Sequence, residues 1–289
     1  MSVRNTTKGR KSAPARKGKP LQRNLEQSAD DSVRSGSTGS RAAGLDAKRG
    51  KSTPMTDLRQ SGEGLQWHRS AMLAAVDRLL EKSVAGHPGE SFSMRVPGRP
   101  EMLFVQSDRG LKARGSRIEL ISLMPDAAEL LDAPDEFKAR AIHISIYLNR
   151  PDTGAVFLGR QKWARILGDL GEAMPAVFDE QVRQLGPRVR RYESWNSRDL
   201  QKAMQQGSNA FLLPEGALIL GMTLDKAIFN AELLEKCARA FVLARLTGRP
   251  FKKIPWYVRL IANQRLRKDE KRSAESYAAG KIPEGFTAY

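Results

Sequence analysis

The sequence predicts an α/β protein with a mostly antiparallel central sheet that is flanked by helices. Short apolar segments come in pairs separated by turn residues: 91–96 alternates apolar and polar residues, 97–100 reads Pro-Gly-Arg-Pro, and 101–105 is apolar again. Longer segments carry apolar residues at helical spacing, most clearly 65–83 and 224–247. Hairpins form antiparallel sheet and amphipathic helices bury their apolar side on it, so this combination favours a layered α/β domain.

The other elements follow the same patterns in chain order. We expect strands at 117–124, 155–158, 188–192, 209–213 and 217–221, and helices at 134–148, 161–168 and from Ser197 onward. Residues 174–178 fit either a loop or a short strand. Thr223 is suited to cap the helix 224–247, because its hydroxyl can accept a hydrogen bond from a free N–H of the first turn. Gly248 and Pro250 then end that helix.

Composition divides the chain into three parts. Residues 1–64 lack apolar periodicity and are rich in Ser, Gly, Thr, Lys and Arg, so they cannot bury enough surface to offset the entropy of ordering. We therefore expect a disordered basic tail at 1–64 and one folded domain at 65–250. Residues 251–289 are expected to form a basic, partly helical C-terminal extension.

The positive charge of the chain favours acidic partners. There are 49 Lys and Arg residues against 32 Asp and Glu, which gives a net charge of +17. The first 20 residues contain no acid and no aromatic side chain, so contact with a polyanion there would be electrostatic and independent of sequence. An acidic protein surface is a second partner class. A solubilising tail without a dedicated partner explains the same composition.

The single cysteine and the absence of long apolar runs bear on the compartment. Cys237 cannot form an internal disulfide, and it lies in an apolar helical segment, so we expect a buried structural thiol rather than a nucleophile. No run approaches the ~20 apolar residues of a membrane span. The basic N-terminus is not followed by the apolar segment of a secretory signal. These features predict a cytoplasmic protein.

Several motifs together resemble one known family. Residues 143–156, HISIYLNRPDTGAV, are very similar to the segment His-x-x-x-Tyr-x-x-Arg-Pro-Asp-x-x-Ala-Val of the class II aldolase/adducin domain family. Residues 211–221, FLLPEGALILG, resemble its Leu-Leu-x-Asn-His-Gly-x-x-x-x-Gly segment, and 91–95 its Asn-x-Ser-x-Arg strand. The resemblance covers about 67–248. It implies a mostly antiparallel sheet between helices, often in a ring-like tetramer.

The resemblance also shows which chemical groups have been replaced. The family includes zinc-dependent sugar-phosphate aldolases and epimerases, in which three histidines hold the zinc and a glutamate acts as acid and base. It also includes the non-enzymatic head of adducin. By the resemblance, Leu158 and Arg160 stand at the His-x-His positions, Glu215 at the third histidine and Ala139 at the glutamate. In the phosphate-loop segment, Ser91 replaces the asparagine and Glu90 the glycine before it.

These replacements predict neither a zinc ion nor a catalytic residue at the family positions. Leucine coordinates nothing and arginine is cationic at any relevant pH. Arg160 and Glu215 are hypothesised to pair where the metal would lie. Arg95, Arg150 and Arg160 are the candidate anion-binding residues, and His143 is expected to be packed or hydrogen-bonded rather than a ligand.

Three functions remain open at this point. The first is a non-catalytic class II aldolase/adducin-like protein, a pseudoenzyme acting as a binding or scaffold module and assembled as a homo-oligomer, by the resemblance a tetramer. The second is a lyase or isomerase with altered or no metal, acting on an anionic, sugar-phosphate-like substrate. The third is a nucleic-acid-associated protein that binds non-specifically through its basic tails.

Overall fold

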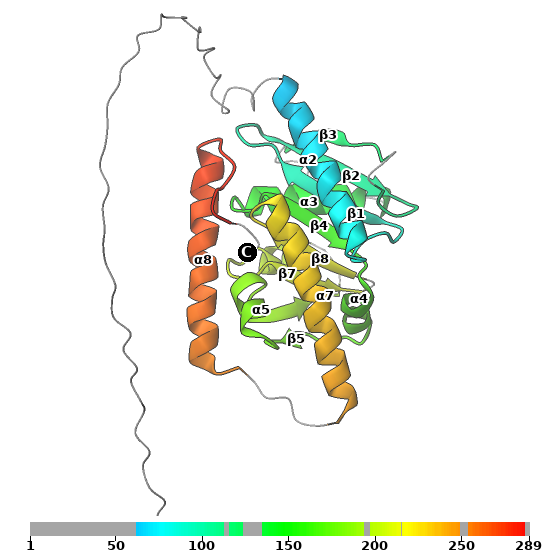
Figure 1. Ribbon diagram of the computed structural model, residues 1–289, viewed down its shortest axis with the longest axis vertical. Coiled ribbons are helices and arrows are strands. Elements are labelled where there is room, and N and C mark those ends of the chain that lie inside the picture. Colours follow the sequence, from blue (N-terminus) through cyan, green and yellow to red (C-terminus); the bar gives the residue numbers. More distant parts are fainter. Residues whose placement is uncertain are drawn as a thin grey trace, which may run out of the picture. The chain divides into compact units, whose positions relative to one another are not determined.

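The structure is a computed structural model that describes residues 62–112, 116–123, 135–193, 197–214, 216–248 and 254–286 (Figure 1). Of the predicted tail, residues 1–61 lie outside this part of the chain. None of the described helices combines the length and the hydropathy that a membrane crossing requires.

A single eight-stranded sheet forms the middle layer of the described residues. Its order is β3-β2-β1-β4-β8-β7-β6-β5. Within it only β6 and β7 pair in parallel, so the predicted mostly antiparallel sheet is confirmed. The strands are β1 (Glu90–Arg95), β2 (Glu101–Ser107), β3 (Glu119–Ser122), β4 (Ala155–Gly159), β5 (Met174–Pro175), β6 (Arg188–Arg191), β7 (Ala210–Leu213) and β8 (Gly216–Gly221).

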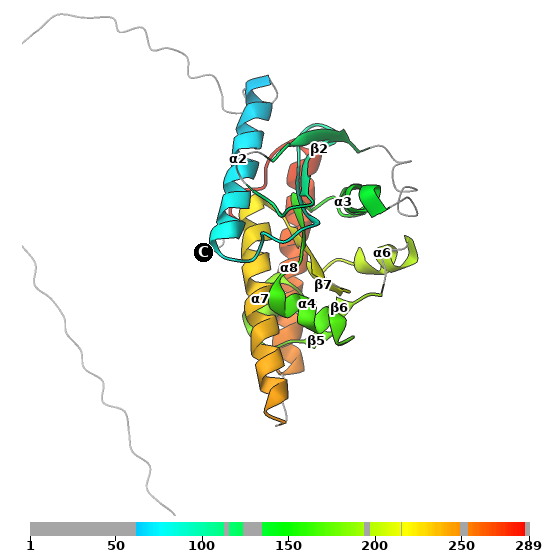
Figure 2. The same ribbon diagram turned by 90° about the vertical axis from the view of Figure 1, so that its right-hand side faces the viewer.

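Helices cover both faces of this sheet. Figure 2 shows α2 and α7 on one side and α3 and α6 on the other. The helices of the described chain are α2 (Gly62–Glu81), α3 (Asp135–Asn149), α4 (Lys162–Asp169), α5 (Asp179–Gln184), α6 (Ser197–Ala203), α7 (Leu224–Leu246) and α8 (Trp256–Ala278). The predicted cap of α7 is confirmed, because Lys226 N–H donates to Thr223 Oγ1 at 3.2 Å.

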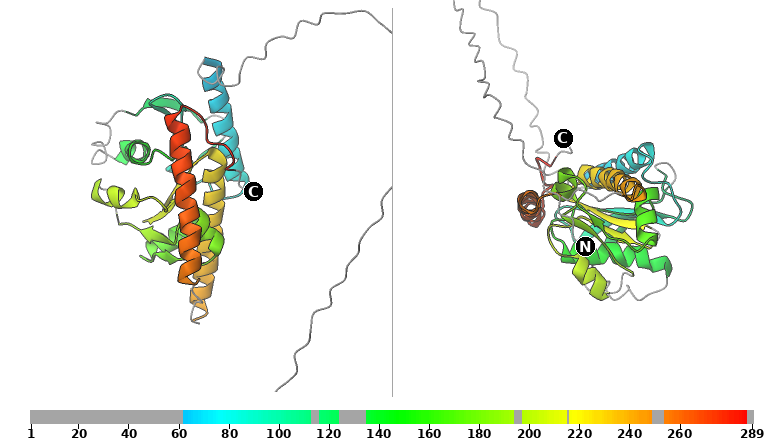
Figure 3. Two further views of the ribbon diagram at one scale, coloured as in Figure 1. Left: turned by 90° about the vertical axis from the view of Figure 1, so that its left-hand side faces the viewer. Right: turned by 90° about the horizontal axis from the view of Figure 1, so that it is seen from below.

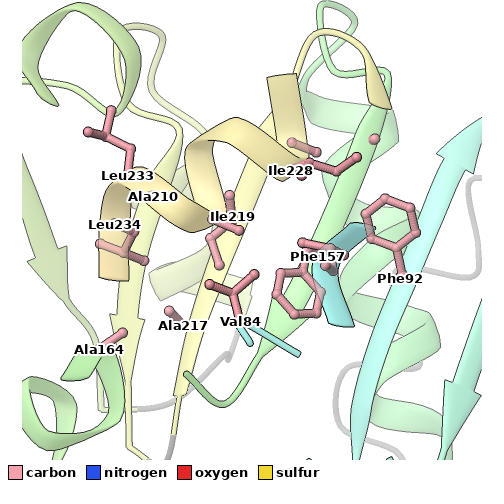
Figure 4. Packing of buried hydrophobic residues seen from close by; sticks show 14 of the residues in the cluster. Val84, Phe92, Phe157, Ala164, Ala210, Ala217, Ile219, Ile228, Leu233 and Leu234 are labelled. Carbon is pink, nitrogen blue, oxygen red and sulfur yellow. The ribbon is translucent and has the colours of Figure 1, made fainter. Parts of the chain in front are cut away.

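The strands contribute alternate side chains to two apolar cores, one on each face of the sheet. Successive side chains of a strand point to opposite faces, so Phe157 joins the core under α2 and α7 while Val156 joins the core under α3. Figure 4 shows part of the first core, where Phe92 and Phe157 of neighbouring strands meet edge to face beneath the helices. Cys237 lies fully buried in this core, as predicted, and burial raises the pKa of its thiol to about 12.

The structure differs from the expectation in three elements. The helix α5 was not predicted, because its six residues are too short for helical periodicity to show. The strand expected at 117–124 pairs only over Glu119–Ser122, and Met124 lies outside the described residues. The basic C-terminal segment forms one 23-residue helix, α8, rather than helix in places.

The helix α8 packs at one end of the sheet (Figure 3). Tyr277 Oη donates to Met222 O just beyond β8, and Ser273 Oγ donates to Asp152 O just before β4. The opposite end of the same strands carries Gly159, the last residue of β4, and Gly216, the first residue of β8. The two ends of these strands therefore carry different groups: the helix α8 packs at one, and Gly159 and Gly216 lie at the other.

Candidate functional site

The first end of the sheet is organised by Glu90, the first residue of β1. Its side chain is completely buried. Oε2 accepts hydrogen bonds from the N–H groups of Gly86 (2.6 Å) and His87 (2.9 Å), and Oε1 accepts one from Arg160 N–H (2.9 Å). Charge-assisted bonds of this kind are about twice as strong as neutral ones. Glu90 thus ties the loop before β1 to the end of β4.

The strand β4 determines where the side chains of Leu158 and Arg160 lie. Leu158 pairs with Ser91 across β1 and β4 and packs against the apolar core under α3. Arg160 directly follows β4, and its guanidinium covers Gly89, since a Cβ on that glycine would lie 3.3 Å from Arg160 Cζ. At Gly216, a Cβ would collide with Gly159 O, so only glycine allows β8 to begin this close to β4.

These residues do not fit a zinc ion. Leu158 has no donor atom, Arg160 is a cation and Ala139 on α3 ends in a buried methyl group. In the described part of the chain, no group of three His, Cys, Asp or Glu side chains gathers that could hold a metal. Glu215 lies outside the described residues, and so does the hypothesised Arg160–Glu215 pair.

A buried polar row runs behind this position, between β1 and α3. His143 Nε2 lies 3.0 Å from Ser91 Oγ, and His143 Nδ1 lies 2.6 Å from Ser93 Oγ. Ser93 Oγ in turn lies 2.9 Å from Tyr147 Oη. Burial lowers the pKa of His143 to about 3, so the imidazole is neutral and one ring nitrogen donates while the other accepts. The expectation of a hydrogen-bonded histidine is confirmed.

Arg150 lies at the second end of the sheet, inside an ionic cluster. It is only 1 % exposed. Its Nε and Nη2 donate to the two carboxylate oxygens of Asp152 at 2.8 and 2.7 Å, in a bidentate pair. Nη2 also reaches Asn209 Oδ1 (2.9 Å) and Glu270 Oε1 (3.2 Å). Arg150 thus binds carboxylates of the protein itself, and a ligand from solvent has no access to it.

Glu270 is a buried ionic partner of Arg150 that the sequence pattern alone did not single out. It is fully buried, and its Oε2 accepts a hydrogen bond from Gly207 N–H at 2.8 Å. Burial raises the pKa of Glu270 to about 7, because Arg150 is shared with Asp152 and compensates only part of the desolvation. The sequence does contain a pattern that indicates a buried side of this helix. Residues recur at helical spacing within the basic segment, namely Leu266, Glu270, Ser273 and Tyr277.

Arg95 ends β1 at this second end, close to Arg150 and away from Arg160. Its Nε donates to Thr153 O (3.0 Å), and its Nη2 donates to Tyr147 O (2.7 Å) and Arg150 O (3.2 Å). The guanidinium also lies over the rings of Tyr147 and Tyr277, with Cζ 5.0 and 5.5 Å from their centroids. The three candidate anion-binding arginines are therefore not brought together.

Comparison with known proteins decides the family. Residues 70–242, more than half of the chain, match the model of the Class II Aldolase and Adducin N-terminal domain. The chain belongs to the class II aldolase and adducin family. This class II aldolase-family chain is 25% identical over 193 residues to a 5-deoxy-D-ribulose 1-phosphate aldolase of Bacillus thuringiensis serovar kurstaki, a match that covers 64% of this chain and 89% of the relative.

Solved structures share the fold of this class II aldolase-family chain. An L-fuculose 1-phosphate aldolase superposes with a TM-score of 0.55 at 20% identity, covering 68% of this chain and 94% of that one. An L-fuculose 1-phosphate aldolase from Glaciozyma antarctica PI12 gives 0.55 at 14% identity, covering 78% and 97%. At these identities the likeness establishes the α/β architecture and not the reaction.

Proposed function

We propose that this class II aldolase-family chain is a non-catalytic member that acts as a binding or scaffold module. The observation that carries the proposal is the packing of Leu158 and Arg160. One side chain joins the apolar core under α3, and the other lies across Gly89 at the end of the sheet. Neither offers a lone pair to a metal, and both fill space at positions where the family resemblance implies ligands.

The contacts of Glu90 support the same proposal. The carboxylate supplies, from within the chain, an anion for three backbone N–H groups at this end of the sheet. Backbone N–H groups of such loops are suited to phosphate. With Glu90 bound to them, a phosphate substrate meets a negative charge rather than free donors.

The second candidate function is a sugar-phosphate lyase with different chemistry. The names of the relatives favour it, since the Bacillus thuringiensis protein and the solved structures described above are named as sugar-phosphate aldolases. For this chain, such a reaction would need an acid or base at the first end of the sheet. Glu90 is a buried carboxylate at this end, and its two oxygens are already engaged by backbone N–H groups.

The decisive experiment measures zinc content and aldol cleavage together. The purified chain is incubated with zinc, passed through a desalting column and analysed for metal, then assayed with L-fuculose 1-phosphate and 5-deoxy-D-ribulose 1-phosphate. We expect no retained zinc and no cleavage. The triple variant Leu158→His/Arg160→His/Glu215→His should retain about one zinc per chain, because it restores three imidazoles.

The matched control is Leu158→Ala/Arg160→Ala/Glu215→Ala, which empties the same positions without adding a ligand and should retain no zinc. Stoichiometric zinc together with cleavage in the unaltered chain would overturn the proposal. Zinc retained equally by both triple variants would show that the metal binds elsewhere.

We further propose a homo-oligomer located in the cytoplasm. Large apolar side chains exposed near the end of α7 and at the start of α8 support the oligomer, and the single buried cysteine fits a reducing compartment. The exposed group comprises Leu243, Leu246, Trp256, Tyr257, Leu260 and Ile261. Light scattering after size-exclusion chromatography tests the assembly, and a mass of about 32.1 kDa, that of one chain, would contradict it.

A further inference from the structure

A cavity lies at the second end of the sheet, where the C-terminal segment closes over Arg95. Its volume is about 220 Å³. The walls come from the start of α2, the end of β1, the start of α7, the end of α8 and residues 282–286. Its position is separate from Leu158 and Arg160, since Arg95 ends the strand that Glu90 begins. The contributing side chains include Trp67, Met94, Arg95, Pro97, Tyr277 and Phe286.

Arg95 places a positive charge in this wall. None of the described carboxylates forms an ion pair with it. Nε and Nη2 are bound to backbone carbonyls, whereas Nη1 has no hydrogen-bond partner within the described ranges. The carboxylate of Asp152 nearby is held by Arg150. Burial accordingly lowers the pKa of Arg95, although the guanidinium remains charged. Asp152 is the neighbouring carboxylate that acts on Arg95, but it is bound by Arg150, so an anion that enters the cavity would stabilise the partly buried Arg95 cation further.

The rest of the cavity wall sets the kind of anion. Trp67, Met94 and Phe286 give it a largely apolar surface, which suits an apolar body rather than a hydrated inorganic ion. The other charged residue of the wall, Asp225, already pairs with Arg78 and would repel a second negative charge. The helix α7 begins at this wall with Leu224, so its dipole adds a modest preference for an anion.

The volume limits the size of the ligand. The cavity has a volume of about 220 Å³. This is below the range of about 300–1,000 Å³ that is typical of drug-sized ligands. A single ring or a short branched chain with one acidic group suits a cavity of this size.

We propose that this cavity binds a small monocarboxylate with an apolar body, whose carboxylate is bound by Arg95 and whose body packs against Trp67, Met94 and Phe286. Tyr277 holds the site together, because its hydroxyl is bound to Met222 O and its ring stacks on Arg95. Gly154 belongs to the same arrangement, since a Cβ there would collide with the Tyr277 hydroxyl. The proposal is independent of the metal position, so either can fail without the other.

The test is isothermal titration of the full chain with phenylacetate, compared with phenylacetamide and with inorganic phosphate. Phenylacetamide has the same shape without the charge, and phosphate has the charge without the apolar body. We expect saturable binding of phenylacetate at one site per chain. The amide should bind at least about tenfold more weakly, because it lacks the ionic contact with Arg95.

Three variants locate the binding. Arg95→Gln removes the charge while keeping donors for the backbone carbonyls, and it should weaken phenylacetate at least about tenfold. Ile282→Trp adds volume to the cavity wall from the partly exposed C-terminal segment and should abolish binding without altering Arg95. Arg188→Gln is the matched control, because Arg188 is exposed on β6 and should leave the affinity unchanged.

Thermal unfolding of each variant separates loss of binding from loss of fold. Loss of binding in Ile282→Trp at an unchanged melting temperature supports the site even where Arg95→Gln is destabilised. The proposal is overturned if phenylacetate does not bind, or if phenylacetamide or phosphate binds as tightly. It is equally overturned if binding persists unchanged in both cavity variants.

Discussion

Replacing Arg150 tests whether the buried ionic cluster supports the fold. Arg150→Met keeps an unbranched side chain of similar length and removes the charge. The carboxylates of Asp152 and Glu270, 2 % and 0 % exposed, then lose the cation with which they pair. Removing one partner of a buried ion pair costs about 3–5 kcal/mol, chiefly through the burial of the uncompensated charge.

This loss converts into a measurable change of melting temperature. For a domain of roughly 150–250 residues, 1 kcal/mol shifts the melting temperature by about 2–4 °C, so Arg150→Met should lower it by about 6–20 °C at pH 8. The assay is differential scanning calorimetry, with Arg188→Met as the control at an exposed site. The control should change the melting temperature by no more than about 2 °C, corresponding to about 0.5 kcal/mol at most for a surface substitution.

The pH dependence distinguishes lost charge from lost packing. At pH 5.5 Glu270 is largely protonated, because its pKa lies at about 7, and one of the two buried charges disappears. Arg150→Met should therefore be destabilised less at pH 5.5 than at pH 8. Adding Glu270→Gln to the variant should recover part of the loss at pH 8. An equal loss at both pH values, or a loss below about 2 °C, would refute the reasoning.

Three further outcomes follow from single buried groups. The pKa of Glu270 rises from 4.5 to about 7 on folding, so the folded chain holds the extra proton and stability falls as the pH rises across this window. In urea titrations at pH 5 and pH 8, Glu270→Gln should reduce that fall, and an unchanged fall would contradict it. Glu90→Gln should cost about 1.5–3 kcal/mol in the same titrations, because it weakens charged hydrogen bonds to three N–H groups, and a neutral effect would argue against the anchor. Cys237 should react with a thiol reagent only after unfolding, because burial raises its pKa to about 12, and rapid labelling of the folded chain would disprove this.

Local pattern was sufficient to predict most of the fold. The hairpin of β1 and β2 could be predicted because alternation and a Pro-Gly turn are both properties of adjacent residues. The helix α7 could be predicted because its cap and its apolar period lie within one segment. The strand order could not be derived this way, since the pairing of β4 with β8 joins residues about 60 positions apart. For that, only the family resemblance was informative.

The sequence identifies the residue types at the candidate site but not their side-chain partners. The chemistry of Leu158 and Arg160 predicts that neither side chain is a zinc ligand, and this prediction needs only the sequence. Arg150 was named as an anion-binding residue, but nothing local showed that Asp152 and Glu270 would enclose it. Glu270 contacts Arg150 from 120 positions away, and such a contact depends on how α8 packs. Side-chain partners of this kind are a property of tertiary structure.

The polar residues of the family motif mainly hold the fold together, because their side chains are buried and bind one another. His143 is held by Ser91 and Ser93, and Arg150 and Asp152 hold each other and the helix α8. Each of these groups is buried, so replacing one would leave a polar partner unsatisfied at a cost of about 1–3 kcal/mol or more. Leu158 and Arg160 are placed differently: the leucine packs on the apolar core under α3, and the arginine extends across Gly89 at the end of the strands. The proposed function therefore requires a change of chemistry at Leu158 and Arg160 only, while the buried polar groups that hold the fold stay in place. The cavity beside Arg95 lies at the opposite end of β1 from Glu90, so the proposed change of chemistry at Leu158 and Arg160 does not involve its walls.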